Sequence, residues 1–408
     1  MSDLFRKKAF EFTEVSVDDK GVSVEKILEL IKYSNFYQQF YDLFKIKEIE
    51  KEFISIPGAT KLVDTMIQIE NSFEKFDLDS SIQNLEFNPS EKFSITFKNI
   101  TDEEINTIID SDEFTAQPIY SSQNDFFSSL FNMDRYANKL FSRKLNHLVY
   151  KNLKEVKEIL KSFLIKDKRY RIVRDKENNY YLRAITSKRY HDYNNNIAVF
   201  VGLITLHNEM KKSKSTFIVQ RCEFNESYVR VFFKSGEIKM LENIGKLENI
   251  IEVSNDEIKR EALRFSCAFS INYGSSNEKD KSIYIKPSRT KANILSIRHN
   301  ILPKTAMDEL VALSNYKEIQ NDLLKDIEAI SKIKSPEAIK HLVFVKIKSA
   351  KSTELKKSKN NILSELTNKV NSLIELLEMM NKIEMLAEEI DAKEYLRYLV
   401  YEALVYKK

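Results

Sequence analysis

A chain of 408 residues is long enough for two or three domains that each bury a core. Hydrophobic residues make up 42% and charged residues 31%, which excludes a disordered chain and is typical of a globular protein with a charged surface. No apolar run reaches the roughly 18 residues of a transmembrane helix, and no secretory signal is visible. With only two cysteines, we expect a cytoplasmic protein without a disulfide framework or a membrane partner.

Charge is distributed unevenly along the chain. Residues 1–142 carry a net charge of −11, residues 143–299 carry +14 and residues 300–408 carry +1. Such an asymmetry points to a polyanionic partner. The alternative is that the acidic first third and the basic middle attract each other within the fold.

We expect residues 1–164 to form an acidic, mainly helical region. Apolar residues recur at helix spacing over 24–53 and over 60–76, with a break at Pro57 and Gly58. A single long helix is predicted over 124–164, aromatic in its early part and rich in lysine later. Shorter strands are predicted near 10–17, 82–87 and 93–97, and a capping box opens a helix at 101–104.

The middle region, residues 165–300, is predicted to be a basic α+β domain with a mostly antiparallel sheet. A helix is expected over 194–212, between hairpins rather than between parallel strands. The predicted strand pairs are 170–174 with 180–186, 217–224 with 228–234, and 265–273 with 283–286.

Residues 301–408 are predicted to be entirely helical, so the fold class as a whole is α+β. The expected helices cover 306–333, a segment that begins near Pro336, 352–390 and 393–406. Apolar residues in the third of these helices step by three and four like a coiled-coil seam: Leu363, Leu366, Val370, Leu373, Leu377 and Met380. We favour packing of this seam within the chain over self-association, although a homo-oligomer is an open alternative.

Catalytic, cofactor and metal motifs are not found in the sequence. The chain lacks the glycine-rich phosphate and dinucleotide signatures, and its five histidines and two cysteines show no zinc-ligand spacing. Cys222 and Cys267 are expected to be small buried hydrophobic residues in strands. Two Glu-x-Lys tripeptides, which begin at Glu237 and Glu257, match part of a metal-dependent nuclease site, so a nuclease is the third functional alternative.

Arginine and tyrosine alternate over residues 166–193, and further basic residues follow in later strands and turns. Arginine neutralises phosphates, and aromatic rings stack on unpaired bases. The predicted nucleic-acid-binding residues are therefore Arg169, Arg171, Arg174, Tyr181, Arg183, Arg189, Tyr190, Arg230, Arg289 and Arg298. The competing interpretation is that the tyrosines belong to the core while the arginine stems reach outward.

Two blocks of the middle region resemble an uncharacterised family of phage- and plasmid-encoded proteins. The first block is Leu182-Arg183-Ala184-x-x-Ser187-x-x-Tyr190-x-x-x-Asn194, and the second is Ser270-x-Asn272-x-Gly274-Ser275 followed by Arg289 and Arg298-His299. The similarity covers about residues 165–310 and departs from the family at Ala292-Asn293-Ile294, where a cysteine and Asn-Gly are expected. The resemblance implies a mobile-element protein without an established activity.

The sequence thus predicts a non-enzymatic nucleic-acid-binding protein of a phage or plasmid. Single-stranded DNA is the favoured target, with annealing, recombination or replication as the setting. The alternative from another class is a protein-interaction factor, such as a virion, assembly or host-defence-modulating component.

Overall fold

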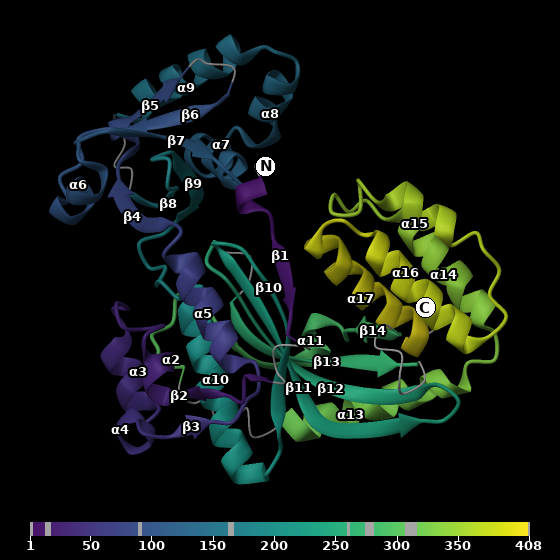
Figure 1. Cartoon of the computed structure of the whole chain (residues 1–408). Helices are drawn as coiled ribbons and strands as arrows, with labels where there is room; N and C mark the ends of the chain where they lie inside the picture. Colours follow the sequence, from purple (N-terminus) through teal and green to yellow (C-terminus); the bar gives the residue numbers. More distant parts are fainter. Residues whose placement is uncertain are drawn as a thin grey trace. The chain divides into compact units, whose positions relative to one another are not determined.

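The computed structural model in Figure 1 describes residues 3–12, 18–88, 92–161, 167–258, 262–273, 281–306 and 316–406. The fold is α+β, as predicted. The chain divides into two compact units. Unit 1 comprises residues 1–6, 67–192 and 257–260, and unit 2 comprises 7–66, 193–256 and 261–408. These units differ from the three predicted regions, because strands of the acidic first third pair with strands of the basic middle.

The six-stranded sheet of unit 1 has the order β4-β8-β9-β7-β6-β5. All neighbours are antiparallel except β7 and β9, which are parallel. The strands are β4 (Glu74–Ser80), β5 (Leu85–Asn88), β6 (Ser94–Phe97), β7 (Phe114–Pro118), β8 (Lys168–Arg174) and β9 (Tyr180–Thr186). The predicted hairpin of the middle region, now β8 and β9, is confirmed. Its sheet partners come from the region that we expected to be mainly helical.

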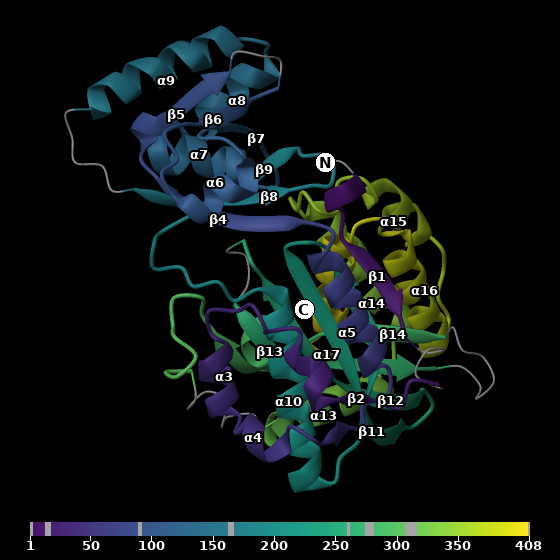
Figure 2. The ribbon, with the colours of Figure 1, turned by 60° about the vertical axis from the view of Figure 1, so that its left-hand side comes forward.

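Helices cover one face of this sheet (Figure 2), with aromatic residues such as Phe126 and Tyr170 in the shared core. They are α6 (Glu103–Ile109), α7 (Ser122–Phe131), α8 (Asp134–Ser142) and α9 (Asn146–Leu160), and a short 3-10 helix covers Ile82–Asn84. The single helix predicted over 124–164 is wrong. Asn132 and Lys144 adopt positive φ angles of 52° and 59°, and a left-handed residue ends a helix.

The larger sheet belongs to unit 2 and has the order β1-β10-β11-β12-β13-β14, with β15 also paired to β13. Its strands are β1 (Lys8–Glu11), β10 (Phe217–Phe224), β11 (Tyr228–Leu241), β12 (Gly245–Asp256), β13 (Leu263–Asn272), β14 (Ser282–Ile285) and β15 (Asn293–Ile297). The predicted hairpins are confirmed, and Cys222 and Cys267 are buried in their strands. Strand β12 was not predicted, because Glu248, Asn249 and Glu252 interrupt its apolar pattern.

One face of the large sheet packs on α10 (Asn195–Ser213), the helix that was predicted over 194–212. A Cβ atom on Gly202 would lie 3.3 Å from a methyl group of Val253, so this glycine permits a close approach of helix and strand. The 3-10 helix Asp3–Phe5 belongs to unit 1. After β1, the N-terminal elements of unit 2 are β2 (Val22–Ser23), α2 (Val24–Leu28), α3 (Tyr37–Leu43), α4 (Ile46–Ile49), β3 (Phe53–Ile54) and α5 (Ala59–Glu70), whose last four residues belong to unit 1. The predicted helix over 24–53 is therefore three short helices.

The C-terminal helices pack against one another and against β14 in unit 2. They are α11 (Arg289–Ala292), α13 (Tyr316–Glu328) with the 3-10 turn Ala329–Lys332, α14 (Pro336–Ser349), α15 (Lys359–Glu365), α16 (Leu373–Leu386) and α17 (Ile390–Tyr406). The helix predicted over 352–390 is two helices, and residues 307–315 of the predicted helix over 306–333 lie outside the described residues. Leu366, Val370, Leu377 and Met380 are buried in this bundle, whereas Leu363 and Leu373 are half-buried. That the seam packs within one chain rather than between copies stays a prediction.

Among the described residues, no helix combines the length and the apolar character that crossing a lipid bilayer requires.

Candidate nucleic-acid interface

Three predicted arginines lie on β8 and pair with acidic residues on β4. The antiparallel register places Asp79 opposite Arg169, Asp77 opposite Arg171, and Glu74 opposite Arg174. Arg169 donates two hydrogen bonds to Asp79, of 2.9 and 3.1 Å, and Arg174 donates to Glu74. Opposite charges at facing positions of neighbouring strands stabilise the pair of strands. Part of the charge asymmetry in the sequence is therefore neutralised inside unit 1.

Arg171 and Arg183 are buried, with exposed fractions of 2% and 1%. Arg171 pairs with Asp77 and Asp192, and Arg183 donates to Glu257 Oε2 at 2.7 Å. Burial opposes the charged guanidinium of Arg171, but the neighbouring carboxylates raise its pKa above the ordinary value. These two side chains are enclosed in this structure, so we reassign them from nucleic-acid contacts to structural ion pairs.

The two predicted tyrosines are held by neighbours within unit 1. The Tyr181 hydroxyl donates to Asp175 at 3.1 Å, and its ring packs edge-on against Phe5 with a centroid distance of 4.7 Å. The Tyr190 hydroxyl donates to the Glu257 carbonyl at 3.1 Å, and its ring lies 5.3 Å from the Arg171 guanidinium. Both rings make contacts that stacking on a base would have to replace.

Arg230 belongs to unit 2 and is 3% exposed, at the centre of a buried ionic network. Its NH1 atom lies 2.6 Å from Glu394 of α17, and its Nε atom lies 3.2 Å from Glu252 of β12. Lys286 bridges the same two carboxylates. This network attaches α17 to the charged face of the sheet, so Arg230 is likewise reassigned to a structural role.

The remaining three predicted arginines, Arg189, Arg289 and Arg298, are exposed. Arg189 lies in the loop after β9 in unit 1, whereas Arg289 and Arg298 flank β15 in unit 2. Gly274, which belongs to the second block of the family resemblance, lies outside the described residues. Of the predicted residues, the structure brings Arg171, Arg183 and Tyr190 together around the buried Glu257.

A different set of cations lies exposed on α8, α9 and the turn between them, and we call it the α8–α9 basic surface. Its members are Arg135, Lys139, Arg143, Lys144, Lys151 and Lys154. Lys151 lies 4.0 Å from Glu155, and the other five form no ion pair with any residue that the structure describes. The sequence signal for this surface was the lysine-rich second half of the predicted long helix.

Helix geometry explains why these cations face outward together. Arg135, Lys139 and Arg143 are four residues apart and share one side of α8 and its C-terminus. The opposite sides of the helices enter the core of unit 1, where Ala137 and Leu153 are fully buried. Each helix is thus anchored by its apolar face and presents its charge to solvent.

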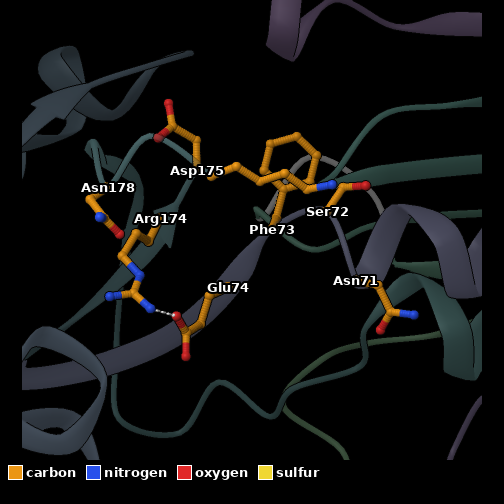
Figure 3. A pocket seen from close by; sticks show the side chains of 8 residues that line it. Asn71, Ser72, Phe73, Glu74, Arg174, Asp175 and Asn178 are labelled. Carbon is orange, nitrogen blue, oxygen red and sulfur yellow. Dashed lines mark hydrogen bonds and ion pairs between the residues drawn. The ribbon is translucent and has the colours of Figure 1, made fainter.

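A polar pocket of about 290 Å³ lies elsewhere in unit 1, beside the ion pair of Arg174 and Glu74 (Figure 3). Its walls come from the turn before β4 and the turn between β8 and β9. The lining side chains are Asn71, Ser72, Phe73, Glu74, Arg174, Asp175, Lys176 and Asn178. This lining combines both signs of charge, with Glu74 and Asp175 beside Arg174 and Lys176, whereas all members of the α8–α9 basic surface are cations.

Comparison of the chain with protein-family models, curated proteins and solved structures gave no match. The resemblance to phage and plasmid proteins therefore stays a prediction. A functional proposal depends on the charge and exposure of the surfaces described above.

Proposed function

We propose that the protein binds nucleic acid through the α8–α9 basic surface of unit 1. The observation that carries the proposal is that six exposed cations gather on two adjacent helices and that only Lys151 forms an ion pair with a residue that the structure describes. A cation that forms no ion pair within the protein attracts phosphate with its full charge. A cation in an internal ion pair attracts phosphate less, because its charge is largely neutralised by its carboxylate partner. Binding a phosphate backbone releases counterions, which supplies much of the affinity of such surfaces.

Single-stranded DNA is the target that we favour within this class. Tyr136 lies between Arg135 and Lys139 on α8 and is 53% exposed. An exposed ring beside phosphate-binding cations stacks on an unpaired base, which a duplex does not offer. Its neighbours on the same helix would follow the backbone on either side of that base.

The test compares two triple variants with the same change in charge. The first, Lys139→Ala/Arg143→Ala/Lys151→Ala, removes half of the α8–α9 basic surface. The control, Lys51→Ala/Lys356→Ala/Lys369→Ala, removes three exposed lysines of unit 2. Binding to a labelled single strand and to the matching duplex is measured by fluorescence anisotropy over a series of salt concentrations.

We expect the first variant to bind more weakly and its slope of log affinity against log salt to flatten by about 2, at about 0.7 per lost single-strand phosphate contact. The control variant should bind as the parent does. Equal affinities for the two variants and the parent would reject this surface. Absence of any binding at low salt would favour the protein-interaction alternative.

A further inference from the structure

Unit 1 contains a second cationic cluster, which is buried and surrounds Glu257. Lys75 Nζ lies 3.1 Å from Glu257 Oε1, and Arg183 NH1 lies 2.7 Å from Glu257 Oε2. The backbone carbonyl of Glu257 accepts hydrogen bonds from Arg171 NH1 and from the Tyr190 hydroxyl. Three cationic side chains and one hydroxyl thus converge on the two acceptor groups of a single residue.

The donors of this cluster are positioned by the sheet and not by Glu257. Lys75, Arg171 and Arg183 lie on β4, β8 and β9, which are neighbours in the sheet. The register between β8 and β9 shifts from the pair Arg171 and Ala184 to the pair Ile172 and Leu182, so Arg183 is the extra residue of a bulge. A bulge re-aims a side chain, and here the extra residue brings its guanidinium to the side of the sheet that carries Lys75 and Arg171.

Glu257, by contrast, reaches the cluster from a turn at the end of β12. Residues 257–260 belong to unit 1, whereas the residues on both sides of this segment belong to unit 2. The Glu257 side chain is fully buried. Burial raises the pKa of its carboxyl group, but Lys75, Arg183 and Arg171 outweigh burial and lower the pKa to about 2. The cluster therefore holds a charged carboxylate firmly.

We propose that Lys75 and Arg183 form an anion-binding site of unit 1, and that the Glu257 carboxylate occupies this site as a ligand supplied by the chain itself. The ligand class is a small anion with two or three oxygen acceptors, either a carboxylate or a phosphate. Guanidinium groups bind both through paired N–H donors, and a buried cluster of cations needs an anion to offset its charge. The proposal does not rest on the α8–α9 basic surface.

Removal of the carboxylate tests the site directly. In Glu257→Ala, Lys75 and Arg183 lose the carboxylate, while Arg171 and Tyr190 keep the backbone carbonyl of residue 257. Inorganic phosphate should therefore bind beside Lys75 and Arg183. A ligand that binds only the folded state raises the unfolding midpoint with its concentration. We expect a saturable rise of the midpoint in phosphate at constant ionic strength for Glu257→Ala, and no such rise for the parent.

Glu70→Ala is the matched control, because it removes the other carboxylate partner of Lys75, at 2.9 Å, while Glu257 stays in place. This control should respond to phosphate as the parent does. If Glu257→Ala fails to fold without phosphate, Glu257→Ser replaces it, since its small hydroxyl group is polar and leaves the volume of the carboxylate free. A folded variant whose midpoint depends on phosphate no more than that of the parent would overturn the proposal.

The source of the anion is distinguished by a second measurement on the same variant. A short single strand with a 5′-phosphate is compared with the same strand without it, and with inorganic phosphate. Tighter binding of the phosphorylated strand to Glu257→Ala, and not to the parent, assigns the site to the end of a nucleic acid. Equal binding of the two strands, with a response to inorganic phosphate, assigns it to a free anion. Because the phosphate titration contains no nucleic acid, its result is independent of the proposed function.

Discussion

Asp77 on β4 lies directly opposite Arg171 on β8, and its carboxylate accepts a hydrogen bond from the Arg171 Nε atom at 3.0 Å. This pair joins the acidic first third of the chain to the basic middle third. The alternative that opposite charges attract within the fold therefore accounts for several residues that we had predicted as nucleic-acid contacts. A group of exposed cations outside the original prediction lies on α8, on α9 and on the turn between them.

Loss of the Arg171 side chain should destabilise unit 1 strongly. Arg171→Ala removes a buried cation and the hydrogen bonds that it donates to Asp77 and Asp192, and a hydrogen bond to a charged group typically contributes about 1.5–3 kcal/mol. Urea unfolding followed by circular dichroism measures the loss. Arg189→Ala removes an exposed arginine of the same unit and should leave the unfolding midpoint unchanged. A similar unfolding midpoint for both variants would show that the ion pair between Arg171 and Asp77 contributes little to the stability of unit 1.

Tyr181→Ala should lower stability without weakening the binding of single-stranded DNA. The ring packs on Phe5 and its hydroxyl is bonded to Asp175, so truncation removes packing within unit 1. We expect a loss of about 2 kcal/mol, less than the roughly 3–5 kcal/mol of fully buried aromatic truncations, because Tyr181 is half-buried. Unfolding and anisotropy titrations on the same preparation check both parts. Weaker binding with parental stability would restore Tyr181 as a stacking residue.

Acid should destabilise unit 2 through Glu223. Burial raises the pKa of this carboxyl group, but three neighbouring guanidinium groups outweigh burial and lower the pKa to about 2. They belong to Arg397, Arg221 and Arg230. Because the folded-state pKa lies below the unfolded value of about 4.3, the carboxylate contributes its stabilisation above that value and loses it as the pH falls toward 2.

The free energy of unfolding should therefore fall between about pH 5 and pH 2, and Glu223→Gln should make this dependence shallower. Urea midpoints at several pH values measure the slope. The exposed Glu86→Gln serves as the control and should retain the parental slope. An unchanged slope in Glu223→Gln would mean that the acid sensitivity has another origin.

Leu377→Ala should destabilise the C-terminal bundle without changing the molecular mass in solution. Leu377 is fully buried among α16 and its neighbours, so its truncation leaves a cavity that typically costs about 2–5 kcal/mol. Thermal unfolding and light scattering are measured together. A parent oligomer that dissociates in this variant would contradict packing of the seam within one chain.

Local pattern was sufficient for much of the α+β fold. Helix α10 and the hairpins β8–β9 and β10–β11 were predicted close to their observed bounds, because each depends on its own apolar period and on the turn inside it. The apolar neighbours of Cys222 and Cys267 in their predicted strands were likewise enough to predict that both cysteines are buried. Local pattern also marked the later part of residues 124–164 as rich in lysine, although it did not predict that this part forms an exposed basic surface.

Tertiary structure alone decided the composition of the two units and the role of each arginine. Strand β4 pairs with β8 across about ninety residues of sequence, as Asp79 opposite Arg169 shows, and no local period encodes such a partner. The alternating pattern of Arg169 and Arg171 predicts only that their side chains share a face. Whether that face meets solvent or acidic side chains depends on which distant strand lies beside it, because burial and ion pairing are properties of the assembled sheet.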